Sequence, residues 1–463
     1  MERNTFKFVH FGCWNNMNNI NKDNGQPEFF NVANNITMSN NDNYYDAMFI
    51  AGDNYYSHKK VVNGKKEKTY KKSDLIKGFD KLKEIEIPKK YVLWGNHDLE
   101  YLISKLEDNN SVRNNNENNN ENNNNNNNSN FMKGSNIVNT QIQIVRENSE
   151  SMEFNNLGFN RSGSNEERNM TKPVFHLYNK EKKTLFVMLD TTLLCKFDEE
   201  TIAQAIFMPY YRGITYNNSD GNKKTIHTTK DYIEYTIFRF KLLLDSINRA
   251  DRRQIKNIVL IGHHPLLFLR TKIKNGKQKP GYLPFKEEGL INIFAELIKV
   301  MNAKLNTKYT LNYLCADFHL YMKATLEIAG KELTQYICGT GGTVLDDLTI
   351  EDFNKFNKQP VSKTNYNLIC QEYVLDYGFL DCLINNNNDI KFTFRSMTKP
   401  IIKNKKKLTT KNNLNTYQSK LTRQTVLGRL FSKGTRKVKP SRSMLSKKKT
   451  TRKQTRKIKT TNK

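Results

Sequence analysis

The chain has 463 residues, of which 37% are hydrophobic and 26% are charged, and its formal net charge at pH 7 is +29. This length and apolar content suffice for one large globular domain or two ordinary ones. No run of about 18 apolar residues occurs, so the sequence predicts no transmembrane helix. The first strand-like run begins at Phe6. We therefore expect no signal peptide and an intracellular protein, with nuclear or virion association as an alternative.

The first 100 residues alternate short apolar runs with polar segments. We predict strands at Phe6 to Phe11, Ala47 to Ala51 and Tyr91 to Trp94, because each run is apolar and ends in a polar turn. The segment from Asn15 to Asn43 is rich in Asn, and we expect a loop there.

A different composition prevails from Asp108 to Met170. Residues 114–130 are almost pure Asn, interrupted by Glu117, Glu121 and Ser129. Such a tract buries no apolar surface, so we expect a disordered insert over about 108–170, with an aggregation-prone segment as the alternative. The abundance of Asn, Lys and Ile resembles proteins of A/T-rich genomes, such as those of giant DNA viruses or certain protists.

Regular structure resumes at Val174. A buried strand is predicted at Thr184–Leu189, followed by the exit loop Asp190-Thr191-Thr192. Apolar residues at helical spacing predict helices over residues 231–250 and 290–301. The later predicted strands are Ile258 to Ile261, Tyr313 to Cys315, Tyr336 to Gly342 (ending in a Gly-rich turn) and Tyr373 to Leu383.

Five of the strand-like runs end in residues that suit a metal site. In chain order these blocks are Gly12-Cys13-Trp14-Asn15, Gly52-Asp53-Asn54-Tyr55-Tyr56, Gly95-Asn96-His97-Asp98, Gly262-His263-His264-Pro265 and Ala316-Asp317-Phe318-His319. Side chains at strand ends converge from distant sequence onto one point of an α/β sheet. Carboxylate, imidazole, amide and thiolate groups are all metal ligands.

The order and context of these blocks resemble the calcineurin-like metallophosphoesterase superfamily, most closely its purple (tartrate-resistant) acid phosphatase branch. The Gly-rich turn and the Tyr-Gly-Phe run at Tyr377–Phe379 resemble the end of the same domain. The resemblance implies an α/β fold over residues 1–400: a four-layer α/β/β/α sandwich of two mixed sheets, with the metal site at the strand ends.

The resemblance also implies two divalent or trivalent metal ions, Fe, Zn or Mn. Asp53 would bridge them. Asn96, His263 and Asp317 would complete one ion's site, and Cys13, Tyr56 and His319 the other. For Tyr56, ordinary packing is the alternative.

Three further residues receive catalytic roles by the same resemblance. His97 would bind phosphate and assist the leaving group, and Asp98 would orient its ring. His264 would shape the cleft wall or contact the substrate.

Two departures from the family pattern leave alternatives open. Cys13 and Asn15 stand where the family has Asp, alone or with His, and Ala316-Asp317 stands where it has Gly-His. A thiolate favours zinc or iron, and an added carboxylate favours harder ions such as manganese or magnesium. An intact two-metal centre, one well-held metal and no metal all remain open.

The last 63 residues form a basic tail. Residues 401–463 contain 22 Lys and Arg and no Asp or Glu, so they carry +22 of the formal +29. We expect this tail to be mostly disordered and to bind nucleic acid without sequence preference. An anionic membrane surface, a localisation signal and a passive extension are the alternatives.

These features predict a metal-dependent phosphoric ester hydrolase, a phosphomonoesterase that uses metal-activated water. One alternative is a phosphodiesterase or nuclease on the same fold, held to nucleic acid by the tail. The other is an inactive phosphoesterase domain that acts as a nucleic-acid-binding or scaffold protein.

Overall fold

A computed structural model describes most of the chain between Thr5 and Thr398. The described residues are 5–62, 65–98, 140–141, 143–145, 147–148, 150–154, 173–196, 215–217, 221–274, 277–282, 289–305, 308–346 and 369–398. The chain divides into two units, residues 1–404 and 405–463. The predicted Asn tract and the basic tail lie outside the described residues.

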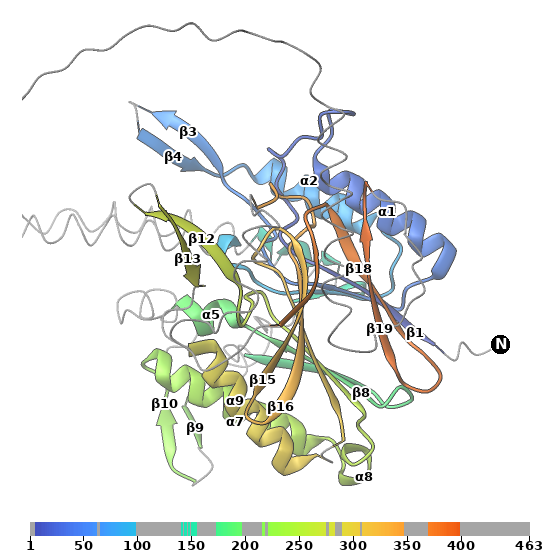
Figure 1. Cartoon of the computed structure of the whole chain (residues 1–463), viewed down its shortest axis with the longest axis vertical. Coiled ribbons are helices and arrows are strands. Elements are labelled where there is room, and N and C mark those ends of the chain that lie inside the picture. Colours follow the sequence, from blue (N-terminus) through green and yellow to red (C-terminus); the bar gives the residue numbers. More distant parts are fainter. Residues whose placement is uncertain are drawn as a thin grey trace, which may run out of the picture. The chain divides into compact units, whose positions relative to one another are not determined.

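Regular elements occupy most of the described part (Figure 1). The helices are α1 (Glu28–Asn43), α2 (Lys72–Lys83), α5 (Thr191–Lys196), α7 (Thr229–Ser246), α8 (Arg249–Arg252) and α9 (Gly289–Lys304). The strands are β1 (Phe6–Phe11), β2 (Ala47–Ile50), β3 (His58–Val62), β4 (Lys65–Thr69), β5 (Lys90–Val92), β6 (Met152–Phe154), β7 (Val174–Asn179), β8 (Thr184–Leu189), β9 (Thr215–Asn217), β10 (Lys223–Thr225), β11 (Asn257–Ile261), β12 (Leu269–Lys274), β13 (Lys277–Tyr282), β14 (Thr310–Cys315), β15 (Tyr321–Ile328), β16 (Lys331–Cys338), β17 (Ile369–Val374), β18 (Gly378–Ile384) and β19 (Ile390–Ser396).

Two mixed sheets carry the fold. The first has the strand order β19-β18-β1-β2-β5-β6, and the second has the order β17-β15-β16-β14-β11-β8-β7. In the first sheet β1, β2, β5 and β6 run parallel, and in the second β8, β11, β14 and β16 run parallel. The remaining neighbours pair antiparallel.

Alternating side chains of the second sheet face two different cores. On β8, Leu185 and Val187 join the core formed with α7 and α9, whereas Phe186 joins the core shared with the first sheet. Phe186 meets Phe8 of β1 edge to face, with ring centroids 5.2 Å apart. Because successive strand residues point to opposite faces, a strand that is apolar throughout is buried on both faces.

Helices cover the outer faces of both sheets. Apolar residues of α1 and α2 join the core of the first sheet, and those of α7 and α9 join the outer core of the second (Figure 1). The predicted four-layer α/β/β/α sandwich is therefore confirmed.

The loop predicted between Asn15 and Asn43 is wrong in its second half, where α1 begins at Glu28 and ends at Asn43. Phe29, Val32 and Ile36 are buried at helical spacing on one face of α1. The many Asn residues lower the apolar content of the segment, but they do not interrupt this period.

Two other predictions change in detail. The insert predicted to extend to Met170 contains the strand β6, which pairs parallel with β5, and Met152 of this strand is buried in the core. The predicted strand Tyr373–Leu383 is two strands: β17 ends at Val374 in the second sheet, and β18 begins at Gly378 in the first.

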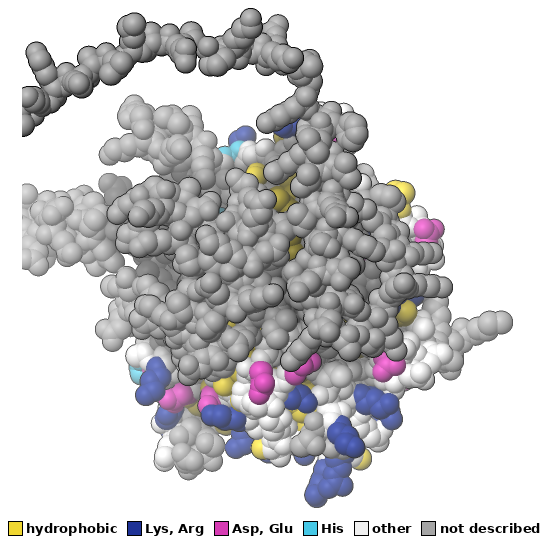
Figure 2. Space-filling view, in the orientation of Figure 1, with side chains coloured by type: hydrophobic (Ala, Val, Ile, Leu, Met, Phe, Trp, Pro, Cys, Tyr) yellow, Lys and Arg dark blue, Asp and Glu magenta, His cyan; other side chains and the backbone are white. Residues whose placement is uncertain are grey.

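The described surface near α7, α8 and α9 mixes charges of both signs (Figure 2). Asp245 of α7 pairs with Arg252 at 2.9 Å and with Lys304 at 2.7 Å. Among the described residues, no helix has the length and apolar character needed to cross a bilayer.

Candidate metal centre

The five predicted blocks meet at one end of the two sheets. Each block follows a strand of a parallel run, so all five lie at carboxyl ends of strands. Backbone hydrogen bonds join the blocks: Cys13 N donates to Gly52 O at 3.0 Å, and Ala316 N donates to His263 O at 2.8 Å. Gly12 N donates to Cys338 O at 3.0 Å, which connects the two sheets at this point.

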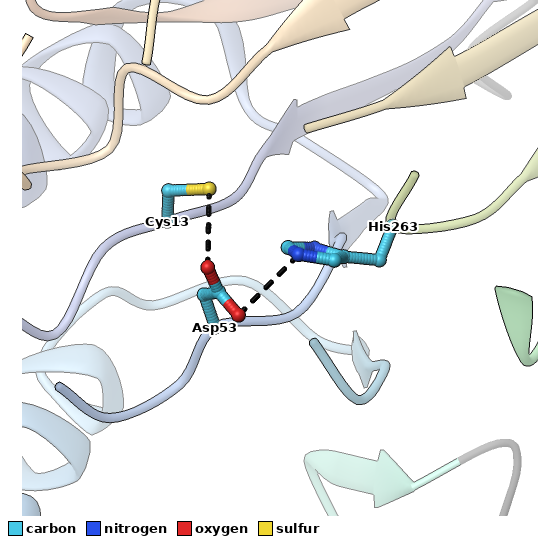
Figure 3. Close-up of side chains that lie close together, drawn as sticks. All are labelled: Cys13, Asp53 and His263. Atoms are coloured by element: carbon cyan, nitrogen blue, oxygen red, sulfur yellow. Dashed lines mark hydrogen bonds and ion pairs between the residues drawn. The ribbon is translucent and has the colours of Figure 1, made fainter. Parts of the chain in front are cut away.

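Asp53 lies at the centre of the site and is fully buried. Its Oδ1 is 3.3 Å from His263 Nε2, and its Oδ2 accepts a hydrogen bond from the Tyr56 hydroxyl at 2.8 Å. Cys13 Sγ lies 3.7 Å from the same Oδ2. Figure 3 shows Asp53 between Cys13 and His263, with one carboxylate oxygen directed at each. A carboxylate placed in this way is suited to bridge two metal ions.

The first donor group surrounds the Nε2 atom of His263. This atom is 3.0 Å from Asn96 Oδ1, 3.3 Å from Asp53 Oδ1 and 3.6 Å from Asp317 Oδ1. Donors that bind one ion at about 2.1 Å lie about 3.0 Å apart in octahedral and about 3.4 Å apart in tetrahedral geometry. The spacing therefore fits a single cation. His263 Nδ1 is 2.5 Å from Ala51 O, and this contact turns Nε2 toward the group.

The second donor group lies on the other side of Asp53. It consists of Cys13 Sγ, the Tyr56 hydroxyl and His319 Nε2, and the last two atoms are 3.4 Å apart. His319 Nδ1 is 2.7 Å from Val344 O, so the ring presents Nε2 to Tyr56. The distance between the Tyr56 and His319 atoms suits two donors of one ion, and the ligand atoms of Cys13, Asp53 and His263 lie within 4.8 Å of one another.

Three of the ligand candidates have left-handed backbone conformations. The φ angles are 54° for Cys13, 55° for Asp53 and 62° for Asp317. Non-glycine residues adopt such angles rarely and at a cost of about 1–3 kcal/mol, and they cluster at functional sites. Here the strain follows from the turn that directs each side chain from a strand end into the centre.

Gly95 is required by the close approach of the second and third blocks. A Cβ atom at this position would lie 2.1 Å from both Asp53 N and Asp53 Oδ1. Only glycine allows the two loops to lie this close.

The two buried carboxylates, Asp53 and Asp317, shift the pKa values of the side chains around them. Burial alone lowers the pKa of His263, but the negative charges of Asp53 and Asp317 outweigh burial and raise this pKa to about 9. Burial and the Asp53 charge together raise the pKa of Cys13 and the pKa of Tyr56. A bound cation would take over the charge balance that these protons provide.

His97 is half-buried beside Asp53, as its position in the third block predicts. Its backbone N–H donates to Asp53 Oδ1 at 2.9 Å, and its ring lies 4.5 Å from the Tyr56 ring, centroid to centroid. Its imidazole therefore lies against Tyr56 of the second donor group.

Asp98 is buried behind His97 and accepts hydrogen bonds from three residues. They are Gly95 N at 2.8 Å, Asn54 N at 3.0 Å and Gln141 Nε2 at 3.1 Å. Burial, followed by the Asp53 charge, raises the pKa of Asp98 to about 7. These bonds hold the second and third blocks together, and orientation of the His97 ring by Asp98 stays a prediction.

His264 is buried next to the first donor group. One of its ring nitrogens lies within 4.8 Å of ligand atoms of His263 and Asp317. Its Nδ1 is 3.3 Å from the hydroxyl of Thr191. This position fits the predicted cleft wall.

Thr191 is a residue of the site to which we assigned no role from the sequence. Its Oγ1 accepts hydrogen bonds from His263 N at 2.9 Å and from His264 N at 3.0 Å. The sequence offered a signal, because Thr191 lies two residues after the apolar run of β8 ends at Leu189, and β8 is the parallel neighbour of β11.

Asn15 does not join the centre, although it stands where the family has a second metal ligand. Its Nδ2 donates to Leu75 O at 3.3 Å, and its side chain occupies the space that a Cβ at Gly78 would need. The residue therefore holds α2 against the first block.

Comparisons with known proteins give one family match, over the first part of the chain. Residues 6–194 match the family described as calcineurin-like phosphoesterase, and the matched segment contains the first three blocks. No curated protein matches the chain. A solved structure described as "GAP50 the anchor in the inner membrane complex of Plasmodium" is similar, with 13% identity, a TM-score of 0.44, and coverage of 90% of this chain and 94% of that one. The match over residues 6–194 agrees with the predicted superfamily, and the acid phosphatase branch stays a prediction.

Proposed function

We propose that this chain, whose residues 6–194 match the calcineurin-like phosphoesterase family, is a metal-dependent phosphomonoesterase of the purple acid phosphatase type. The carboxylate of Asp53 carries the proposal. Its Oδ1 faces His263 and its Oδ2 faces Tyr56 and Cys13, so one residue belongs to two donor groups. A phosphoester is the substrate that the family implies.

In this proposal, one set of residues binds the metal ions and another set contacts the substrate. Two bound divalent ions would supply a hydroxide nucleophile and neutralise charge on the phosphoryl oxygens. The ions would be Fe, Zn or Mn, held by Cys13, Asp53, Tyr56, Asn96, His263, Asp317 and His319.

His97 is the proposed acid catalyst. Its ring lies against Tyr56, and its backbone is bound to Asp53, so the imidazole is held beside the place where phosphate would lie. From there it would bind a phosphoryl oxygen and donate a proton to the departing alkoxide or phenoxide. His264 would line the opposite wall.

A phosphodiesterase or nuclease is the second candidate, and the tail favours it. Residues 401–463 carry +22 and no negative side chain. Counterion release would concentrate the domain on a nucleic acid backbone.

Metal analysis and three substrates test the proposal. The purified full-length chain is assayed for bound metal, then with an aryl monophosphate, an aryl phosphodiester and DNA. Fastest turnover of the monophosphate, lost with a chelator and restored by added metal, is the expected result. A preference for the diester or DNA would favour the second candidate. Bound metal without hydrolysis of any of the three would favour an inactive scaffold protein.

A further inference from the structure

The two donor groups beside Asp53 differ in chemical softness. Around His263, Asn96 contributes an amide oxygen and Asp317 a carboxylate oxygen, so the group is rich in oxygen. On the other side, Cys13 contributes sulfur, Tyr56 a phenolic oxygen and His319 an imidazole nitrogen. Soft thiolate ligands favour Zn²⁺ and similar ions, whereas oxygen ligands favour Mn²⁺ or Mg²⁺.

The position of the Cys13 sulfur fits a metal ligand. Sulfur bound to zinc at about 2.3 Å and oxygen bound at about 2.1 Å lie about 3.6 Å apart in a tetrahedral site. The observed distance from Cys13 Sγ to Asp53 Oδ2 is 3.7 Å. The other side chains packed around Cys13 include the small residues Ala51 and Ala316, and a Cβ at Gly339 would lie only 3.4 Å from Sγ. This packing holds the sulfur against its polar neighbours.

Other buried cysteines have different surroundings. Cys315 Sγ lies 3.5 Å from Tyr336 O, and Cys382 Sγ lies 3.7 Å from Leu380 O. Both contacts are with backbone carbonyl groups, as expected for a cysteine that serves as core packing. Cys13 instead contacts a carboxylate, and its left-handed backbone, φ 54°, directs it there.

We infer that the two positions of this centre select different ions: a thiophilic ion such as Zn²⁺ on the Cys13 side, and a harder ion such as Mn²⁺ on the Asp317 side. The inference rests on the proposed metal centre. On binding, a metal–sulfur bond forms and the thiol proton leaves to solvent. The chain would therefore hold two unlike metals when Mn²⁺ is supplied in excess of Zn²⁺.

Cobalt titration of the full-length protein tests the sulfur ligand directly. Co²⁺ bound to a thiolate has a sulfur-to-metal charge-transfer band in the near ultraviolet, and this readout does not depend on activity. We compare wild type with Cys13→Ser, Cys13→Asp and the control Cys382→Ser, which alters a cysteine equally buried but outside the site. The band is expected in wild type and Cys382→Ser and should be absent from both Cys13 variants. Cobalt bound to wild type without the band, a band that persists in Cys13→Ser, or no cobalt bound at all would overturn the inference.

Competition between Zn²⁺ and Mn²⁺ tests the selectivity. After dialysis against Zn²⁺ and a large excess of Mn²⁺, which offsets the generally higher affinity of protein sites for Zn²⁺, wild type should hold close to one of each ion per chain. In Cys13→Asp, the preference of that side for Zn²⁺ over Mn²⁺ should fall by at least about tenfold. An unchanged preference would overturn the inference.

Hydrolysis measured in parallel separates this inference from the proposed function. A sulfur band without any metal-dependent hydrolysis would leave the selective site standing and reject the enzyme. Metal-dependent hydrolysis without the band would do the opposite.

Discussion

Thr191 lies beneath His263 and binds its backbone: the threonine Oγ1 accepts the His263 N–H at 2.9 Å. The same oxygen accepts the N–H of His264 at 3.0 Å, so one hydroxyl holds the turn that presents both histidines. All three residues are buried, and water cannot easily replace the hydroxyl.

Thr191→Val should therefore weaken both the fold and the centre. It keeps the shape but leaves two buried N–H groups without their acceptor, at a cost of about 1–3 kcal/mol. We expect a lower free energy of unfolding and weaker metal binding, measured by denaturant titration and equilibrium dialysis. Thr191→Ser, which retains the oxygen, is the control. Equal values for Val and Ser variants would contradict the positioning role.

Asp53→Asn should remove most bound metal from both donor groups and abolish hydrolysis, because the Asp53 carboxylate contacts both groups. His263→Ala should empty the oxygen-rich group in the same way. Metal analysis and hydrolysis assays check both. Asp23→Asn is the matched control, because it makes the same exchange at an exposed position. Full metal content in Asp53→Asn would show that the second block is not a ligand block.

Gly95→Ala should damage the centre without changing any ligand. The added methyl group would lie 2.1 Å from Asp53 N and Oδ1, so the Asp53 loop must move. We expect metal content and turnover to fall while circular dichroism stays like that of wild type. Gly289→Ala is the control, because a Cβ there meets nothing within 4 Å. If both variants bound metal equally well, the close approach of the two loops would not matter.

His10 should make stability depend on pH. It is fully buried between the sheets with Nε2 3.2 Å from Cys315 O, and burial lowers its pKa to about 4. The unfolded chain, with a pKa near 6.5, binds the proton first as pH falls, so the native state loses stability between about pH 6.5 and pH 4. The expected loss is about 2 kcal/mol between pH 7 and pH 5.

Denaturant titrations of wild type and His10→Gln at the two pH values measure this contribution. The difference in unfolding free energy between the proteins should shrink at pH 5, because glutamine does not titrate. A difference that stays constant with pH would exclude His10 as the cause.

Truncation after Lys399 should leave hydrolysis of small substrates unchanged, because residues 401–463 contain no proposed ligand. It should abolish most binding to random-sequence duplex DNA, because it removes +22 of charge. Binding of the full chain should weaken with salt, with a log–log slope of about −0.9 per phosphate neutralised. Salt titrations of both proteins check this, and unchanged binding after truncation would reject the tail as the contact.

Much of the sandwich was predictable because its strands are unusually apolar. β1 and β8 have the bounds that the sequence predicts. In β8 the reason is plain, since a strand buried on both faces is an almost continuous apolar run between polar turns. The polar blocks after such runs were visible for the same reason. The prediction failed for α1, because we inferred a loop from the many Asn residues of this segment. Its apolar residues nevertheless recur at helical spacing and form a buried face.

The sequence by itself determined which residue types stand at the strand ends, and it predicted that the candidate metal ligands would gather at one end of the sheets. Only the tertiary structure decided which of these residues belong to each of the two donor groups. It placed Asp53 between two donor groups, turned Asn15 away to α2, and put Thr191 beneath the histidines. The physical reason is that strand ends set where each loop begins, whereas side-chain direction depends on backbone angles and on contacts between loops far apart in the chain. The left-handed angles of Cys13, Asp53 and Asp317 are set by those contacts, and no local pattern encodes them.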